Sequence, residues 1–305
     1  MDGELRAGVI GAGVFGGYHA AKYASLPGVR FVGAYDHHLV HAEALAAKHG
    51  GQAFADEAAL IAAADVLTIA TPAIAHAQAA LAALAAGKAV YVEKPVATTR
   101  ADADRIVAEA EQRGLVTACG FLERAGFAAM GLFDIPERPL LLEAVRVGPP
   151  SPRNLDVSVA LDLMIHDLDL ALALGAGTRR AVTATGRARS GQQLDEAQAE
   201  ITFDTGFVAR FRASRIAEGR ERTMRVVYPS GEVRLDFLAH TFDNSTPFPL
   251  DAGYEGRPES RDRLGASVAA FLAAVRGERP SPLATAEHGA RALDLALAVE
   301  EAVAP

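Results

Sequence analysis

A cluster of glycines near the start of the chain has the spacing of a nucleotide-binding loop. Gly11, Gly13 and Gly16 form a Gly-x-Gly-x-x-Gly pattern together with Val14 and Phe15. The first glycine permits a tight turn, the second lets the backbone approach a pyrophosphate, and the third lets helix and strand pack closely. Free N–H groups at the start of the following helix favour an anion. The loop therefore predicts a dinucleotide site.

A carboxylate follows at the position that would contact the ribose. Asp36 closes the next predicted strand, 20 residues after Gly16. It can accept hydrogen bonds from both ribose hydroxyls, and its charge would repel a 2′-phosphate. His37 and His38 come next, where an arginine would favour the phosphate. The pattern favours NAD over NADP as the cofactor. A Rossmann-like fold that binds no cofactor is the alternative.

Two basic side chains are suited to acid–base chemistry. His166 is a candidate base because imidazole titrates near neutral pH. Asp162 precedes it by one turn of a predicted helix and could orient the ring or bind substrate. Lys94 follows a predicted parallel strand, at the edge where such sheets bind ligands. Its ammonium could stabilise charge on a reacting oxygen or, once desolvated, serve as the base. Taken singly, each of these residues also has an ordinary structural interpretation.

The first third of the chain alternates strand and helix patterns, with glycines or capping residues at the junctions. Short apolar strands separated by helices predict an α/β fold with a doubly wound, mostly parallel sheet, that is, a Rossmann domain. The predicted strands are 5–10, 30–35, 53–54, 66–70, 89–92 and 116–120, and the predicted helices end at 25, 49, 63, 86 and 113.

After Gly120 the pattern changes to successive strands with hairpin turns, which predicts an α+β domain with an open, mostly antiparallel sheet. We expect a boundary between a cofactor domain, 1–120, and a substrate-binding and oligomerisation domain, 121–305. The expected elements are a long apolar helix at 155–174, strands at 182–187, 197–203, 208–214, 223–228 and 233–237, a loop at 240–262, and helices at 262–276 and 286–303.

Composition narrows the function classes. The chain has 305 residues, half of them hydrophobic, and a net charge of −8, which argues against a nucleic-acid or anionic-membrane partner. Its single cysteine, Cys119, excludes an intrachain disulfide and a cysteine-based metal site, and we predict no metal. Neither a signal peptide nor a membrane-spanning run is recognisable, so we expect a cytoplasmic protein.

Charged residues are unevenly distributed. The only four lysines, Lys22, Lys48, Lys88 and Lys94, lie in the first third of the chain. The segment from Arg179 to Arg225 contains ten arginines and six acidic residues. This local excess of positive charge is compatible with a diphosphate-bearing substrate, and equally with a solvated surface.

Several motifs together resemble the glucose–fructose oxidoreductase and inositol dehydrogenase (Gfo/Idh/MocA) family. They are the glycine-rich loop, Thr71-Pro72 with His76, Glu93-Lys94-Pro95, and the spacing of Asp162, His166 and Asp167. The resemblance implies nicotinamide-dependent oxidation of a sugar or polyol hydroxyl, and a second domain whose open sheet often forms homodimers or homotetramers. It also implies that Thr71, Pro72, His76, Glu93 and Lys94 contribute to the cofactor site, with His19 nearby.

The segments Gly120–Arg124 and Leu161–Asp169 resemble a subgroup that acts on UDP-N-acetylhexosamines and includes UDP-N-acetylglucosamine 3-dehydrogenases. This implies a UDP-sugar substrate oxidised at C3, with Lys94, His166 and Asp162 as catalytic residues. Phe121 and Ala125-Gly126-Phe127 depart from the subgroup, which has His and Phe-Asn-Pro there. Another sugar or polyol dehydrogenase and a non-catalytic nucleotide-binding regulator are the alternatives. The expected substrate contacts are Lys94, Arg124, Arg153, Asn154, Asp162 and His166.

Overall fold

A computed structural model describes residues 4–151, 156–189 and 193–303, and its contacts fall into two units. The first unit comprises Met1–Leu122 and Asp262–Ala290, and the second comprises Glu123–Arg261 and Arg291–Pro305. The first unit thus leaves its N-terminal stretch at Leu122, close to the domain boundary predicted after residue 120. It also includes residues 262–290, which the sequence analysis places in the second domain.

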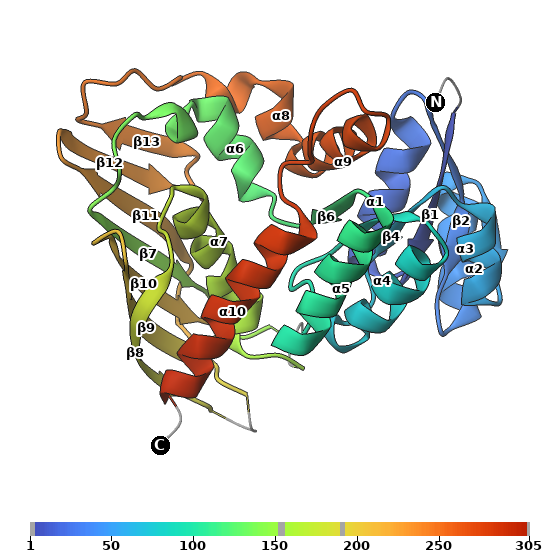
Figure 1. Cartoon of the computed structure of the whole chain (residues 1–305), viewed down its shortest axis with the longest axis horizontal. Coiled ribbons are helices and arrows are strands. Elements are labelled where there is room, and N and C mark those ends of the chain that lie inside the picture. The colour runs from blue at the N-terminus through green and yellow to red at the C-terminus, as the bar shows by residue number, and fades with distance from the viewer. Residues whose placement is uncertain (1–3, 152–155, 190–192, 304–305) are drawn as a thin grey trace. The chain divides into compact units, whose positions relative to one another are not determined.

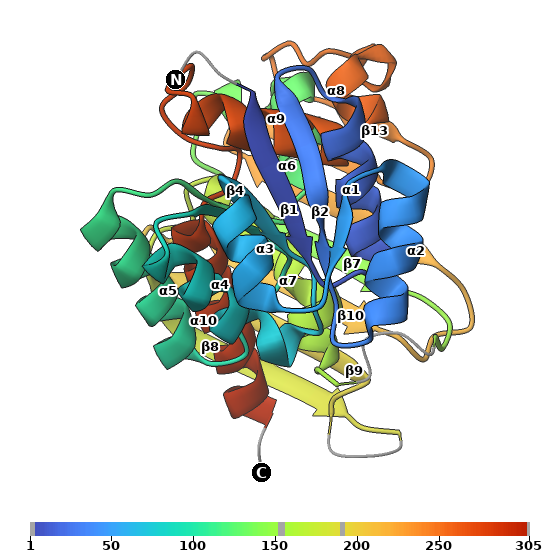
Figure 2. The same ribbon diagram turned by 90° about the vertical axis from the view of Figure 1, so that its right-hand side faces the viewer.

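Sheet A of the first unit is parallel, in the order β3-β2-β1-β4-β5-β6. In Figure 2, α1 and α2 lie on one side of this sheet and α4 and α5 on the other, which confirms the predicted doubly wound fold. Its elements are β1 (Leu5–Ile10), α1 (Val14–Ser25), β2 (Val29–Tyr35), α2 (Leu39–His49), β3 (Gln52–Phe54), α3 (Glu57–Ala63), β4 (Val66–Ile69), η1 (Ala73–Ala75), α4 (His76–Ala85), β5 (Ala89–Val92), α5 (Arg100–Arg113), β6 (Thr117–Cys119) and α9 (Arg263–Val275).

Local sequence signals explain where these helices begin and end. The Asp56 carboxylate accepts a hydrogen bond from Ala58 N and caps α3, while Thr99 accepts one from Asp102 N and caps α5. Gly114, in the left-handed region at φ +61°, ends α5. The connections are therefore short, and the carboxyl ends of the strands lie along one edge of the sheet.

Helix α9 completes the core of the first unit although it comes late in the chain. Its Phe271 is fully buried and packs edge-to-face against Tyr91 of β5, whose hydroxyl bonds Ser267 Oγ at 2.9 Å. Val268 and Leu272 join the same apolar cluster. No local pattern assigns a late helix to an early sheet, so the sequence analysis did not find this contribution.

Sheet B of the second unit has the order β13-β12-β11-β7-β10-β9-β8, and its pairs are antiparallel except β7 with β10. This confirms the predicted open, mostly antiparallel sheet. The elements of this unit are α6 (Glu123–Met130), η2 (Leu132–Asp134), β7 (Leu141–Val147), η3 (Ala160–Met164), α7 (Ile165–Ala173), β8 (Arg179–Arg187), β9 (Glu196–Phe203), β10 (Val208–Ser214), β11 (Glu221–Tyr228), β12 (Gly231–Asp236), β13 (Thr241–Asn244), η4 (Tyr254–Gly256) and α8 (Pro258–Arg261).

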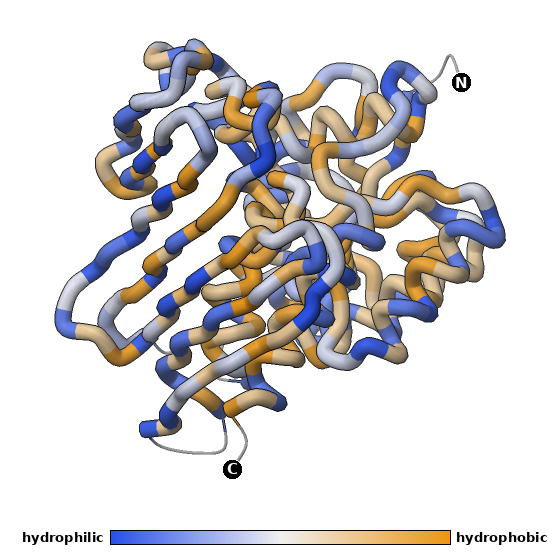
Figure 3. Tube along the Cα trace, turned by 60° about the vertical axis from the view of Figure 1, so that its left-hand side comes forward, coloured by the Kyte–Doolittle hydropathy of each residue, from blue (hydrophilic) through white to orange (hydrophobic). Residues whose placement is uncertain are grey.

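One face of sheet B is covered by α6, α7 and the second half of α10 (Ala286–Val303) (Figure 1). Figure 3 brings the opposite face forward and shows hydrophilic and hydrophobic residues alternating along the strands. No helix of the described residues lies on that face in these views. The alternation therefore gives each strand one side in the core and one side open.

The predicted helix at 155–174 begins later than expected and is irregular at its start, and residue 155 lies outside the described ranges. Tertiary hydrogen bonds take up the backbone there, because Val159 N donates to Leu194 O and the Val157 carbonyl accepts from Arg215, each at 2.8 Å. Residues 160–164 form the π-helical turn η3, and regular α-helix begins only at Ile165. The sequence analysis also missed β7 and α6, and it assigned β13 to a loop.

Candidate active site

The three glycines of the loop between β1 and α1 have different roles. Gly11 has φ +97°, and a Cβ there would lie 2.6 Å from the Ala70 carbonyl. A Cβ on Gly16 would collide with the carbonyl oxygen of Gly11. A Cβ on Gly13 would meet nothing within 4 Å, and its backbone is extended. The fold itself thus requires Gly11 and Gly16, whereas the space over Gly13 fits a ligand that approaches the backbone.

The first turn of α1 offers backbone donors to such a ligand. Gly13 is the N-cap and has no side chain to accept a bond from the first amides of the helix. The side chains of Val14 and Phe15 are 50% and 41% exposed. The first turn is therefore accessible, and an anion there would gain from both the amides and the helix dipole.

Asp36 lies directly after β2 and faces the glycine-rich loop. Its Oδ2 accepts a hydrogen bond from Ala12 N at 2.8 Å, and its Oδ1 accepts one from His38 N at 2.9 Å. His41 Nδ1 lies 3.3 Å from Oδ1. Since a carboxylate oxygen can accept more than one bond, Asp36 retains capacity for ribose hydroxyls. Its position supports the predicted preference for NAD.

Thr71 and Pro72 follow β4 at the same edge of sheet A. The Thr71 hydroxyl is buried and has no hydrogen-bond partner within the described ranges of the chain, so it is a polar atom that a bound cofactor could satisfy. Pro72 is exposed and caps η1. The open space over Gly13, the helix amides, Asp36 and this hydroxyl fit NAD.

His76, which the sequence analysis expects to contribute to the cofactor site, is buried against the backbone. Its ring is 2% exposed, with Nδ1 2.7 Å from the Pro95 carbonyl oxygen and Nε2 2.9 Å from that of Thr71. Burial lowers the pKa of His76, in spite of these two carbonyls and the charge of Glu93, which raise it. Each ring nitrogen therefore faces a backbone carbonyl, and the single N–H of the neutral ring can donate to either one. The geometry favours a role in fixing the Thr71 segment over direct cofactor contact.

Glu93 and Lys94 follow β5 at this edge, and Lys94 is half-buried. Glu93 is 7% exposed and accepts a 2.8 Å hydrogen bond from His19 Nε2. Burial would raise the pKa of Glu93, but the bond from His19 and the nearby charge of Lys94 lower it below its ordinary value. Gly120 leaves room for this carboxylate, because a Cβ there would lie 2.5 Å from Glu93 Oε2.

His19 belongs to a buried chain of hydrogen bonds. Its Nδ1 lies 3.2 Å from Thr68 Oγ1, which lies 2.7 Å from the Tyr23 hydroxyl. Because the Glu93 carboxylate can only accept, His19 Nε2 carries the hydrogen and Nδ1 accepts from Thr68, which in turn accepts from Tyr23. The sequence placed His19 near the cofactor, and the structure shows that it fixes Glu93.

The second unit holds His166 in the first turn of α7 and Asp162 in η3. The side chain of His166 is 16% exposed, and Asp162 is 8% exposed. The expected one-turn spacing assumes a continuous α-helix, and a π-helical turn changes that register because its bonds span five residues. The two residues are thus on consecutive elements, not on one regular helical face.

Glu123 of α6 is a neighbour of His166 that sequence reasoning did not select. Its Oε2 lies 3.5 Å from His166 Nδ1, and its Oε1 accepts a 3.0 Å bond from Arg146 Nη1. Arg146 of β7 also donates two bonds to Asp167, at 3.0 and 2.8 Å. Burial would raise the pKa of Glu123, but His166 and Arg146 hold it well below its usual range.

Arg124, another predicted substrate contact, is paired inside the second unit. Arg124 is 7% exposed and donates two bonds, at 2.8 and 2.7 Å, to the buried carboxylate of Asp169. Burial raises the pKa of Asp169 in spite of Arg124. This geometry favours a structural role for Arg124. Arg153 and Asn154 lie outside the described residues.

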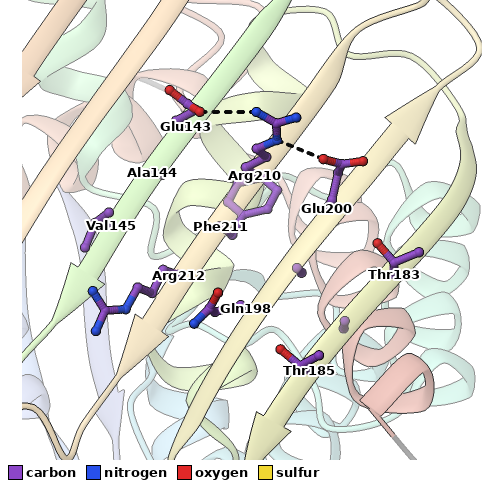
Figure 4. Close-up of a pocket in the computed structure, with 12 residues that line it drawn as sticks. Glu143, Ala144, Val145, Thr183, Thr185, Gln198, Glu200, Arg210, Phe211 and Arg212 are labelled. Carbon is purple, nitrogen blue, oxygen red and sulfur yellow. Dashed lines mark hydrogen bonds and ion pairs between the residues drawn. The ribbon is translucent and has the colours of Figure 1, made fainter.

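The arginine-rich segment is largely balanced by acidic residues. Arg210 lies between Glu200 at 2.8 Å and Glu143 at 3.4 Å on the open face of sheet B (Figure 4). Arg225 pairs with Glu143 and Glu232, both of which lie outside the counted segment. These pairs favour the solvated-surface interpretation over a diphosphate site.

Comparison with known proteins adds the family. Residues 5–121 match an oxidoreductase family with an NAD-binding Rossmann fold, and residues 149–234 match the GFO/IDH/MocA C-terminal domain. The chain belongs to the Gfo/Idh/MocA family. It is therefore an NAD-dependent oxidoreductase, which confirms the predicted cofactor and reaction class. Among the described residues, no helix combines the length and the apolar character needed to cross a bilayer.

One relative matches over nearly the whole chain. The UDP-N-acetylglucosamine 3-dehydrogenase of Acidithiobacillus ferrooxidans is 34% identical, over 98% of this chain and 97% of the relative. Its solved structure superposes with a TM-score of 0.90 over 98% of each chain.

Two further relatives are more partial or more distant. The inositol 2-dehydrogenase of Paracoccus denitrificans is 33% identical, but over 54% of this chain and 53% of its own. A dehydrogenase of Bordetella pertussis, solved with NADH and UDP-GlcNAcA, is 19% identical with a TM-score of 0.89, over 99% and 96% of the two chains, which shows a shared fold.

Proposed function

We propose that this protein oxidises the C3 hydroxyl of a UDP-N-acetylhexosamine to a 3-keto sugar, with NAD as oxidant. The observation that carries the proposal is the likeness to the Acidithiobacillus enzyme, which extends through both units at 34% identity. The likeness to the Paracoccus inositol dehydrogenase covers about half of the chain at similar identity. Substrate preference in a two-domain enzyme depends on both domains, so the full-length match supports the UDP-sugar over inositol.

In this proposal one residue removes the hydroxyl proton and another stabilises the charge left on the oxygen. His166 takes the hydroxyl proton, and the ammonium of Lys94 hydrogen-bonds the same oxygen and stabilises the charge that develops on it. Asp162 binds the sugar or orients the base. When bound, NAD accepts the hydride from the sugar carbon. The glycine-rich loop and Asp36 hold the cofactor, and Glu93 fixes the start of the Lys94 segment.

A substrate panel tests the proposal. Purified protein is incubated with NAD and UDP-N-acetylglucosamine, UDP-N-acetylgalactosamine, free N-acetylglucosamine or myo-inositol, and NADH absorbance is recorded. A hydroxylamine-type reagent that captures the ketone removes the equilibrium limit on alcohol oxidation, and mass spectrometry identifies the oxidised sugar. We expect NADH with the UDP-sugars alone.

The same panel separates the alternatives. NADH formation with free sugar or inositol and none with UDP-sugars would replace the proposal with another sugar or polyol dehydrogenase. No turnover with any compound, together with intact NAD binding, would favour a nucleotide-binding regulator. The presence of both Lys94 and His166 speaks against a regulator, because a protein without catalysis does not need them.

We also propose that the open face of sheet B joins protomers into a homodimer or homotetramer in the cytoplasm. This face carries charges of both signs, with Arg210 and Arg212 beside Glu143 and Glu200, and the partly exposed Val145 among them (Figure 4). Such a surface can be complementary to a second copy of itself across a two-fold axis.

Light scattering after size exclusion tests this assembly against the protomer mass of 31.9 kDa. We expect wild-type protein at a multiple of that mass and Val145→Arg at the mass of one protomer. Glu111→Arg, on the exposed side of α5, is the control and should assemble normally. A monomeric wild type would contradict the proposal.

A further inference from the structure

A partly buried carboxylate from a different element faces the ring of His166. Glu123 lies at the start of α6, and its side chain is 15% exposed, nearly the same as the 16% of His166. The Oε2–Nδ1 separation of 3.5 Å is longer than an ordinary hydrogen bond, and such contacts commonly shorten when a substrate binds. Because this carboxylate faces Nδ1, the nitrogen that would act as the base in this arrangement is Nε2.

Glu123 is itself held in place from the opposite side. Arg146 donates to its Oε1 at 3.0 Å and uses Nε and Nη2 for Asp167, so the guanidinium is fixed by two carboxylates. The ring of Phe237 lies beneath Arg146, with its centroid 5.6 Å from the guanidinium carbon. Glu123 therefore cannot turn away from His166 without breaking a partly buried ion pair with Arg146.

Other charges near His166 do not replace this contact. Asp169, three residues after His166 on α7, is paired with Arg124 through both of its oxygens. Asp167 is paired with Arg146 in the same way. Arg222 contributes a further positive charge near Arg146 and Glu123. Glu123 contacts the His166 ring directly, with its Oε2 3.5 Å from Nδ1.

We propose that Glu123 is a positioning residue: its Oε2 holds the Nδ1–H of His166, so that Nε2 bears the lone pair that takes the proton from the substrate hydroxyl. The inference rests on the proposed function, because it assumes that His166 is the base. The hydroxyl proton moves to Nε2 as the C–H bond breaks and its electron pair leaves with the hydride to NAD. The resulting imidazolium is paired with the Glu123 carboxylate until the proton passes to solvent.

Glu123→Gln tests the inference because it nearly keeps the shape and changes the donor pattern. The glutamine oxygen would accept from Arg146, which directs the amide NH₂ toward His166 Nδ1. Nδ1 must then accept, and the ring hydrogen moves to Nε2, where the neutral tautomer can no longer take a proton. We expect kcat to fall by about a hundred-fold or more, with KM and NAD affinity little changed.

The tautomer can be observed without turnover. In protein labelled with ¹⁵N-histidine, the signals of His166 are identified by their loss in His166→Gln. We expect the Nδ1–H tautomer in the wild type and the Nε2–H tautomer in Glu123→Gln. Glu123→Asp, which keeps the charge at a shorter reach, should restore part of the lost kcat.

Asp167→Asn is the matched control. It removes a buried carboxylate from the same Arg146 network, one residue from His166, but leaves Glu123 in place. We expect a lower melting temperature, with the wild-type tautomer and kcat close to that of the wild type. Equal losses of kcat in Asp167→Asn and Glu123→Gln would mean that the network acts only through stability and would overturn the inference.

The outcomes separate the two proposals. A wild-type protein with His166 in the Nε2–H form overturns the positioning role, whether or not Glu123→Gln folds. A folded Glu123→Gln with wild-type kcat and tautomer overturns it as well. If the wild type oxidises no UDP-N-acetylhexosamine, the proposed function fails, while the tautomer measurement still decides whether Glu123 sets the protonation of His166.

Discussion

In each unit a glutamate of low exposure contacts a histidine, and the two pairs differ in geometry. His19 and Glu93 are 2.8 Å apart, and their side chains are 0% and 9% exposed. His166 and Glu123 are 3.5 Å apart, and their side chains are 16% and 15% exposed. In the first pair Thr68 takes up the second nitrogen of the ring. In the second pair the ring retains an exposed edge.

This difference separates a structural use of the Glu–His pair from a chemical one. A histidine with both nitrogens bonded inside the core can only hold its neighbours, and here it holds Glu93 at the end of β5. A histidine that lies near a carboxylate and is partly exposed, as His166 is, can exchange protons with a substrate. Residue type alone does not distinguish these cases, and the four predictions that follow test the contrast.

The largest expected effect is on turnover. His166→Ala and Lys94→Ala should each lower kcat by about 10²- to 10⁴-fold, because each removes a group that acts on the reacting hydroxyl. Circular dichroism and NADH titration should show folded protein with near wild-type cofactor affinity. Near-normal kcat in either variant would remove that residue from the catalytic assignment.

Next in size is the stability of the first unit. His19→Ala leaves Glu93 buried without its hydrogen-bond donor, which should cost about 3–5 kcal/mol of unfolding free energy. His166→Ala should cost less, because Glu123 keeps its bond to Arg146. Urea unfolding of both variants measures the difference. Equal losses would mean that the two pairs are not distinct in the way proposed.

Acid sensitivity should follow the same contrast. The pKa of Glu93 and that of Glu123 are both lowered in the folded protein from an ordinary value of 4.5, and that of Glu123 lies further down. Each carboxylate thus stabilises the fold above pH 4.5, and this stabilisation is lost as pH falls through the lowered pKa. The melting temperature should fall on acidification below that value.

Two variants show how much each carboxylate contributes to the fall in melting temperature at low pH. Glu93→Gln should flatten the melting profile just below pH 4.5, whereas Glu123→Gln should change it down to lower pH, since its carboxylate stays charged longer. Identical profiles for the two variants and the wild type would show that neither pair contributes to acid unfolding.

The smallest expected effect concerns Asp36, a carboxylate whose histidine neighbour, His41, is exposed. Asp36 is held by the amides of Ala12 and His38. Asp36→Ser should weaken NAD about tenfold and relax discrimination against NADP by a similar factor, equivalent to about 1.4 kcal/mol. Fluorescence titrations with NADH and NADPH measure both constants. An unchanged ratio would count against Asp36 as the ribose ligand.

Most of the first unit could be predicted because its signals are local. Apolar runs of strand length, glycine punctuation and capping residues such as Thr99 gave its six strands and the helices between them. In the second unit the same reasoning failed where hydrogen bonds between distant parts of the chain determine the backbone conformation. The backbone of Val157 and Val159 bonds to Arg215 and Leu194, so the helix starts only after these residues, with the π-helical turn at 160–164.

The candidate site divides in the same way. Gly11, Gly13 and Gly16 follow one another in the chain, so spacing alone could assign them. The contact between Glu123 and His166 depends on how α6 and α7 pack, which no spacing reveals. The only available signal for Glu123 is its place in the segment Gly120–Arg124, which gives no role. Likewise, the sequence could not show that Arg124 is paired with Asp169 inside the unit.

The late position of α9 has a consequence for synthesis of the chain. The sheet of the first unit is complete once β6 has been made, but its core still lacks Val268, Phe271 and Leu272. Until these residues leave the ribosome, Tyr91 has neither its aromatic neighbour nor the hydroxyl of Ser267. The nascent cofactor domain therefore cannot complete its core, and its apolar surface stays exposed, while the strands of sheet B are translated. A fragment that ends after β6 should need a chaperone, or α9 supplied as a separate peptide, to remain in solution.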